Sequence, residues 1–138
     1  MSTKDDYDKQ AEDFLKKHDI TMTIGFDRQG KYFPGDKDDR NIYIVTLACL
    51  RDGLLSDFSI KFGDSVVNTR KKTKPSAYDV LSVMTKSDPG TFRDFCADYG
   101  YSDDSIMAYE VYRDVFKEWR KVENFFTVGE LIELQEIN

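Results

Sequence analysis

The sequence predicts a single α+β domain, in which an N-terminal helix precedes a three-stranded antiparallel β-meander and four helices that pack on the sheet. Apolar residues recur at helical spacing near both ends of the chain and alternate with polar residues in the middle. An Asp-Gly pair, Asp52-Gly53, separates two alternating runs, which is a strong hairpin signal. The chain has 138 residues, 40% of them hydrophobic, so residues 1–138 can form one domain with a sizeable core.

The first helix is predicted to begin after Ser2 or Thr3, either of which can cap it, and to run to about His18. His18 is the only histidine in the chain. Because it stands at the end of a helix, we expect it to be a charge partner there rather than a catalyst. The face of this helix that we expect to turn to the core consists of Tyr7, Ala11, Phe14 and Leu15.

Three strands follow, each predicted from a period of two. Residues 20–26 alternate, and residues 40–50 carry apolar side chains on both faces. We therefore expect the second strand to be buried on both sides and to lie in the middle of the sheet. Phe58, Ile60 and Phe62 share one face of the third strand.

Two irregular segments interrupt this pattern, and we predict exposed loops there. Residues 28–40 combine apolar and acidic side chains, namely Tyr32, Phe33, Asp36, Asp38 and Asp39. Residues 63–75 include a run from 68 to 74 that has no apolar residue and four bases, Arg70, Lys71, Lys72 and Lys74. A long loop is often functional, so these nine side chains are our candidate partner-binding residues.

The last part of the chain is predicted to be helical. Ser76 can cap one helix, and Asp88 can cap the next with Pro89 at its first position. Ser102 is expected to begin the longest helix, which runs to Phe126 and turns an apolar stripe to the core. Thr127 and Glu130 make a capping box for the final helix. The stripe of the longest helix consists of Ala108, Val111, Tyr112, Val115, Trp119, Val122 and Phe126.

Charge is unevenly distributed along the chain, although the net charge is only −6. Residues 20–75 have ten bases and seven acids, whereas residues 76–138 have six bases and thirteen acids. Such poles can orient a molecule on a charged partner, or they can simply keep it in solution. The chain has no run of about twenty apolar residues and no apolar signal core near its start, so we expect a cytoplasmic protein that does not enter a membrane. We expect Cys49 and Cys96 to be buried free thiols.

The residues point away from an enzyme. The chain has no glycine-rich phosphate loop, no paired-cysteine metal spacing and no histidine-containing metal motif. We therefore expect no catalytic residue, cofactor or metal. Two alternatives stay open, a cation held by the acids of residues 27–39 and carboxylate catalysis by acids that meet only in the folded chain.

The charged segments suggest two kinds of macromolecular partner. The bases of residues 68–74 could contact phosphates, although no aromatic residue is interleaved with them for base stacking. The acidic C-terminal helices could instead imitate nucleic acid and occupy a protein that binds it. Bases are mixed among those acids at pairing distance, so charge alone does not favour this reading.

A string of short motifs resembles small proteins that are encoded by bacteriophages and other mobile elements. The string consists of Phe62-Gly63-Asp64-Ser65, Ala77-Tyr78-Asp79-Val80-Leu81, Asp88-Pro89-Gly90-Thr91-Phe92, Phe95-Cys96 and Gly100-Tyr101. The resemblance assigns no catalytic or binding residue. What it implies is a context, since small phage proteins of this kind are often accessory factors that bind a host protein, including inhibitors of host defence such as anti-CRISPR proteins.

The leading hypothesis is thus a non-enzymatic accessory protein of phage or mobile-element origin that binds a host protein. We expect the host protein to belong to a nucleic-acid-handling defence complex, which the accessory protein inhibits. The expected contacts are residues 28–40 and 63–75 first and the acidic helix faces second. The alternative hypothesis is a small nucleic-acid-binding module that uses residues 68–74.

Overall fold

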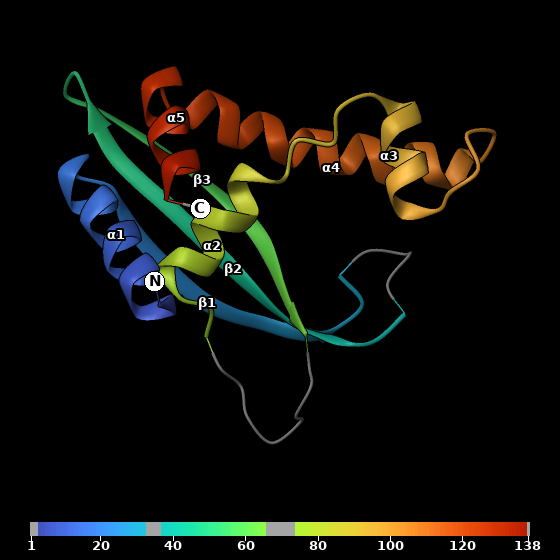
Figure 1. Ribbon diagram of the computed structural model, residues 1–138, viewed down its shortest axis with the longest axis horizontal. Helices are drawn as coiled ribbons and strands as arrows, with labels where there is room; N and C mark the ends of the chain where they lie inside the picture. The colour runs from blue at the N-terminus through green and yellow to red at the C-terminus, as the bar shows by residue number, and fades with distance from the viewer. Residues whose placement is uncertain (1–2, 33–36, 66–73, 138) are drawn as a thin grey trace.

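The computed structural model describes residues 3–32, 37–65 and 74–137, and it confirms the α+β fold (Figure 1). A helix is followed by three antiparallel strands and then by four more helices. The elements are α1 (Lys4–Lys17), β1 (Thr21–Gly30), β2 (Arg40–Arg51), β3 (Leu54–Ser65), α2 (Ala77–Thr85), α3 (Phe92–Tyr99), α4 (Ile106–Phe125) and α5 (Val128–Glu136).

The sheet has the predicted order β1-β2-β3, with β2 in the middle. Asp52 and Gly53 both have positive φ angles, 53° and 79°, as the two-residue hairpin turn between β2 and β3 requires. The strands are longer than the sequence pattern indicates. A bulge between Phe26 and Arg28 lets β1 continue to Gly30, and β3 continues to Ser65. Both predicted loops therefore begin later than residues 28 and 63.

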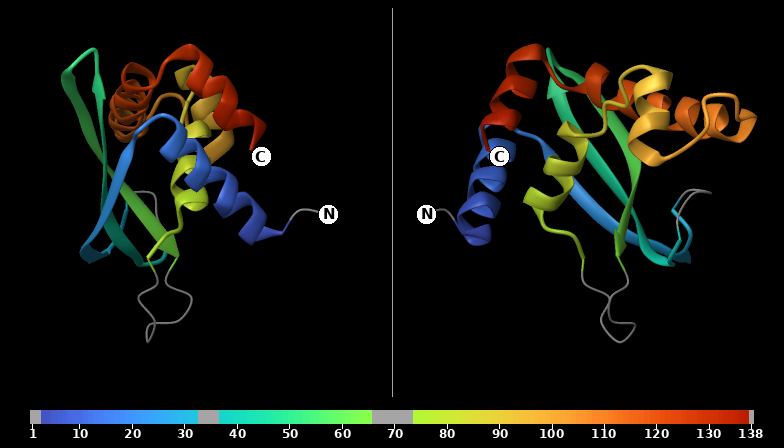
Figure 2. Two further views of the ribbon diagram at one scale, coloured as in Figure 1. Left: turned by 90° about the vertical axis from the view of Figure 1, so that its left-hand side faces the viewer. Right: turned by 45° about the vertical axis from the view of Figure 1, so that its right-hand side comes forward.

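The helices lie on one side of the sheet (Figure 2). The side chains of Tyr43, Val45 and Leu47 point to that side and are fully buried. The opposite face is more open, and there Thr46 and Ser59 share a hydrogen bond of 2.7 Å. The prediction that β2 is buried on both sides is therefore confirmed only in part, because Ile42 on this face is also buried whereas Leu50, near the hairpin turn, is exposed. Apolar residues on both faces of a strand do not ensure that a second layer covers both.

Three helices begin at the expected caps, Thr3, Ser76 and Thr127, and each cap forms a capping box, which the sequence predicted only for Thr127. Two other predicted starts are wrong. The cap of α3 is Thr91, because Gly90 has a φ of 67° that interrupts a helix, and Asp88 instead accepts a hydrogen bond from the Gly90 N–H. The cap of α4 is Ser105 rather than Ser102. Ser102 forms a local turn, in which its hydroxyl accepts from the Asp104 N–H.

The longest helix, α4, divides into two halves with different neighbours. Val122 and Phe125 in its C-terminal half belong to the main core beneath the sheet. The N-terminal half extends to the right in Figure 1 and packs against α3. Cys49 and Cys96 are buried free thiols, as predicted. None of the helices in the described residues is long and apolar enough to cross a membrane.

Candidate functional site

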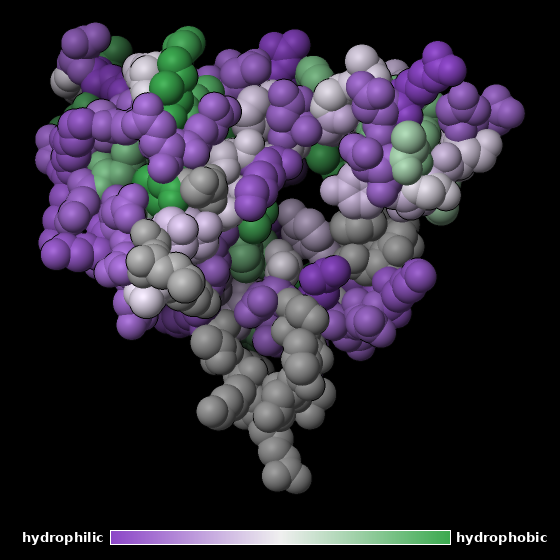
Figure 3. All heavy atoms as spheres, in the orientation of Figure 1, coloured by the Kyte–Doolittle hydropathy of each residue, from purple (hydrophilic) through white to green (hydrophobic). Residues whose placement is uncertain are grey.

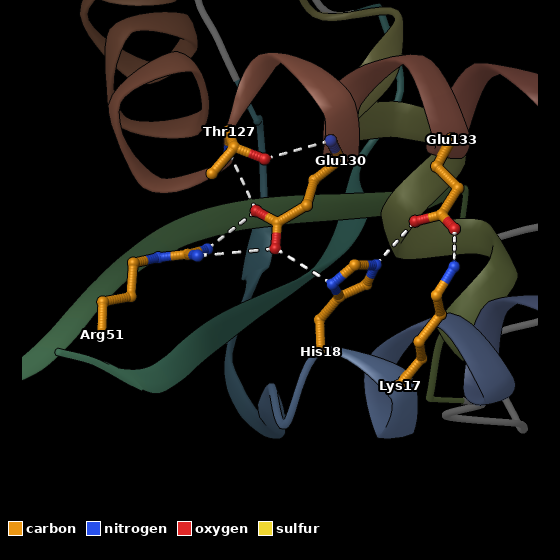
Figure 4. A network of polar contacts seen from close by, with 6 residues as sticks. All are labelled: Lys17, His18, Arg51, Thr127, Glu130 and Glu133. Atoms are coloured by element: carbon orange, nitrogen blue, oxygen red, sulfur yellow. Dashed lines mark hydrogen bonds and ion pairs between the residues drawn. The ribbon is translucent and has the colours of Figure 1, made fainter. Parts of the chain in front are cut away.

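A network of polar side chains joins α1, β2 and α5 (Figure 4). Glu130 on α5 is buried, and its carboxylate accepts hydrogen bonds from Arg51 at 2.8 and 3.4 Å and from the Thr127 N–H at 2.8 Å. His18 bridges the two acids of α5, with Nδ1 at 3.2 Å from Glu130 and Nε2 at 2.6 Å from Glu133. Lys17 also pairs with Glu133. His18 therefore connects the end of α1 to α5, and its role as a charge partner rather than a catalyst stays a prediction.

The network lowers the pKa of both glutamates. Burial alone would raise the pKa of Glu130, but the hydrogen bonds from Thr127 and Arg51 and the charges of Arg51 and His18 outweigh it. Hydrogen bonds from Lys17 and His18 lower the pKa of Glu133. A carboxyl group with a lowered pKa in the folded state stabilises the fold at pH values above its unfolded pKa. This stabilisation is lost as the pH falls through the lower pKa of the folded state.

We therefore expect the free energy of unfolding to fall as the pH drops below about 4.5, the ordinary pKa of a glutamate. Urea unfolding measured from pH 7 to pH 3 checks this expectation. The double variant E130Q/E133Q should be less stable than the parent at pH 7 and should lose less on acidification. An equal loss of stability in the two proteins would show that other groups cause the acid sensitivity.

The same network holds the base of a projecting hairpin. Arg51 is the last residue of β2, and its guanidinium also lies 5.4 Å from the centre of the Phe125 ring. The hairpin tip, which we define as residues 50–55, extends beyond this anchor to the upper left in Figure 1. Three leucines lie there, and Leu50 is 69% exposed, Leu54 75% and Leu55 68%. Leu50 and Leu55 are paired across the two strands, so they form one apolar surface.

A second exposed surface lies at the other end of α4. The helical lobe, which we define as residues 88–112, consists of α3, the first turns of α4 and their connections. Its interior is a cluster of aromatic rings. The centre of the Tyr112 ring lies 5.4 Å from the centres of both the Phe92 ring and the Phe95 ring. The Tyr112 hydroxyl donates to the Gly90 carbonyl oxygen at 2.7 Å. This cluster gives the lobe a packed interior separate from the main core.

The predicted partner-binding residues are only partly described. Phe33, Asp36, Arg70, Lys71 and Lys72 lie outside the described residues. Of the other four, Tyr32 supports the fold, since its hydroxyl donates to the Lys61 carbonyl oxygen at 2.8 Å and its ring lies against Gly63. A Cβ added at Gly63 would come within 2.9 Å of that ring. Asp39 lies 3.6 Å from Lys31, and Asp38 and Lys74 are exposed.

Lys74 also lines a hollow of about 650 Å³ between α2 and the end of the β2–β3 pair. The hollow has a mixed lining, with Arg40 and Lys74 as cations and Asp64 and Asp79 as acids. It therefore has no strong preference for an anion or a cation. In residues 3–32, 37–65 and 74–137, no three His, Cys, Asp or Glu side chains come close enough together to hold a metal ion.

The sequence reasoning missed the hairpin tip and the exposed side of the helical lobe. A signal for the tip was present, because three leucines lie within two residues of the Asp-Gly turn, where polar residues are usual. A signal for the exposed side of the lobe was also present, since Ile106, Met107 and Tyr109 lie outside the apolar stripe predicted for the longest helix.

Comparison with known proteins gives no guide to function, so the function is inferred from the exposed surfaces of the structure. The chain matches no protein-family model, and neither curated proteins nor solved structures include a significant match.

Proposed function

We propose that the protein is a non-catalytic binding protein that covers part of the surface of another protein. The observation that carries this proposal is the hairpin tip, with Leu50, Leu54 and Leu55 each more than two-thirds exposed. Full burial of one leucine contributes about 1.5–3 kcal/mol, so a partner that covers the Leu50–Leu55 face and reaches round the tip to Leu54 would gain several kcal/mol. The tight turn and the anchored Arg51 hold the tip before binding, which reduces the entropy lost on association.

The motif resemblance supports a more specific form of this proposal. The protein would be an accessory factor of a phage or mobile element that acts in the host cytoplasm and inhibits a host defence complex, as anti-CRISPR proteins do. Covering a working surface of that complex would be enough for inhibition. The exposed residues Asp38 and Lys74, which lie at the other end of the strands from the hairpin tip, would make additional contacts together with the predicted residues outside the described ones.

The test is an affinity pulldown with the tagged full-length protein from nuclease-treated lysate of its host. We expect one host protein to be retained, and the triple variant L50S/L54S/L55S to retain about tenfold less of it, because the apolar contact is lost. The thermal midpoint of the triple variant should stay close to that of the parent, since these side chains are exposed.

A matched control replaces exposed apolar residues elsewhere. The variant V83S/V128S/I132S removes three such side chains from α2 and α5 and should retain the partner as the parent does. Equal retention by the hairpin-tip variant and the parent would contradict the role of the tip. If nucleic acid were recovered and every protein were lost on nuclease treatment, the alternative function, a nucleic-acid-binding module that uses residues 68–74, would replace this proposal.

A further inference from the structure

The exposed side of the helical lobe carries large apolar side chains that the ring cluster does not cover. Ile106 is 78% exposed, Tyr99 59%, Tyr109 52% and Met107 49%. Apolar residues gathered at one end of a small protein are typical of an interaction site, and tyrosine and methionine are enriched in such sites. Both tyrosines also pack against rings of the cluster. The ring centre of Tyr99 lies 4.8 Å from that of Phe95, and the ring centre of Tyr109 lies 5.4 Å from that of Phe92.

The backbone of the lobe is fixed at each turn. Thr91 and Ser105 cap the two helices, and Gly100, with a φ of 73°, ends α3 in the left-handed conformation. The Tyr101 N–H then donates to the Cys96 carbonyl oxygen at 2.9 Å. The exposed apolar residues are therefore presented on a preformed surface, which lowers the cost of binding a partner.

The charge of this surface indicates the chemistry of its partner. Residues 88–112 contain six acids and one base, a net charge of −5, out of −6 for the whole chain. The space-filling view shows mainly hydrophilic residues over this end of the molecule (Figure 3). All six acids take part in no ion pair within the described part of the chain: Asp88, Asp94, Asp98, Asp103, Asp104 and Glu110.

One of these acids works against the stability of its own helix. Asp98 lies in the last turn of α3, where a negative charge is unfavourable, and it is four residues from the like charge of Asp94. A lobe that exposes both rings and unpaired carboxylates complements a surface of lysine and arginine with apolar or aromatic residues among them. Proteins use that combination of cations and stacking platforms to bind the phosphates and bases of nucleic acids.

We propose that the helical lobe binds the nucleic-acid-binding surface of a basic partner protein and competes with nucleic acid for it. This inference rests on the proposed function, because it names the chemistry of the partner that the binding protein covers. The unpaired carboxylates occupy the places of phosphates, and the exposed tyrosines and Ile106 contact the apolar platforms. The hairpin tip, at the opposite end of α4, contacts another part of the same partner.

The experiment uses the heparin-binding proteins of a nuclease-treated host lysate as the probe. They are passed over the immobilised full-length protein, and the retained protein is challenged with a DNA duplex of about 30 base pairs. We expect the duplex to release the retained protein. We also expect the variant D94N/D98N/D103N/D104N to retain about tenfold less of it.

A matched variant removes the same charge at the other end of the molecule. D5N/E12Q/D13N/D19N changes four exposed acids on or beside α1 and should retain the partner as the parent does. If the duplex releases nothing, or if the two variants retain equal amounts, the inference is overturned while the proposed binding function stands. If the parent retains no protein from the heparin-binding fraction or from whole lysate, both proposals are wrong.

Discussion

Replacement of Glu130 by alanine is expected to lower the free energy of unfolding by about 3 kcal/mol. The substitution removes one half of the capping box of α5, since the Thr127 N–H donates to the Glu130 carboxylate. It also leaves the half-buried guanidinium of Arg51 without its carboxylate partner. The thermal midpoint should fall by about 10 °C in a domain of this size, which differential scanning calorimetry measures directly.

The variant E130Q separates the two parts of this effect. A glutamine oxygen can still accept from the Thr127 N–H, but it carries no charge for Arg51 or His18, so we expect about half of the loss seen with alanine. E136A is the control, because Glu136 is an exposed acid at the end of the same helix and its side chain makes no hydrogen bond or ion pair with the described residues. If E130A and E136A were equally stable, the network would have no role in joining α1, β2 and α5.

Replacement of Leu47 by alanine is expected to cost about 3 kcal/mol as well, for a different reason. Leu47 lies on the covered face of β2 and is fully buried in the core cluster. Removal of its methyl groups leaves a cavity that the surrounding side chains fill only partly. Urea unfolding at neutral pH measures the loss.

Leu50 provides the matched control on the same strand. It points to the opposite face and is 69% exposed, so L50A should change the free energy of unfolding by less than about 0.5 kcal/mol. The comparison tests whether the sheet is covered on the Leu50 face at its hairpin end, because replacing a covered Leu50 would cost stability as replacing Leu47 does. It also tests the hairpin tip, since a leucine that supports the fold would not be available to a partner.

Local signals in the sequence predicted most of the fold. The alternation of residues 20–26, the turn at Asp52-Gly53 and the capping box of Thr127 and Glu130 each depend on neighbours within a few positions, and the structure confirms all three. The start of α3 was harder to predict, because Asp88-Pro89 and Thr91 are both good starting signals. The positive φ of Gly90 decides between them.

Contacts between distant residues were beyond the reach of such signals. Arg51 and Glu130 are 79 positions apart, and His18 and Glu133 are 115 apart, so no spacing in the sequence indicates that they meet. The exposure of Tyr99, which follows Phe95 at helical spacing, was hidden for a related reason. A helical or alternating pattern shows which residues share a face, but only the arrangement of the other elements determines whether that face is covered.

The most direct test of the binding function is hydrogen exchange measured by mass spectrometry on the complex of the full-length protein with the host protein that it retains. Slower exchange in the complex should appear in peptides from residues 50–55 and from residues 92–110, where the leucines of the hairpin tip and the exposed rings of the helical lobe lie. Peptides from α1 should exchange at the same rate with and without the partner. If the partner slows exchange neither in residues 50–55 nor in residues 92–110, the assignment of these surfaces to partner binding is contradicted.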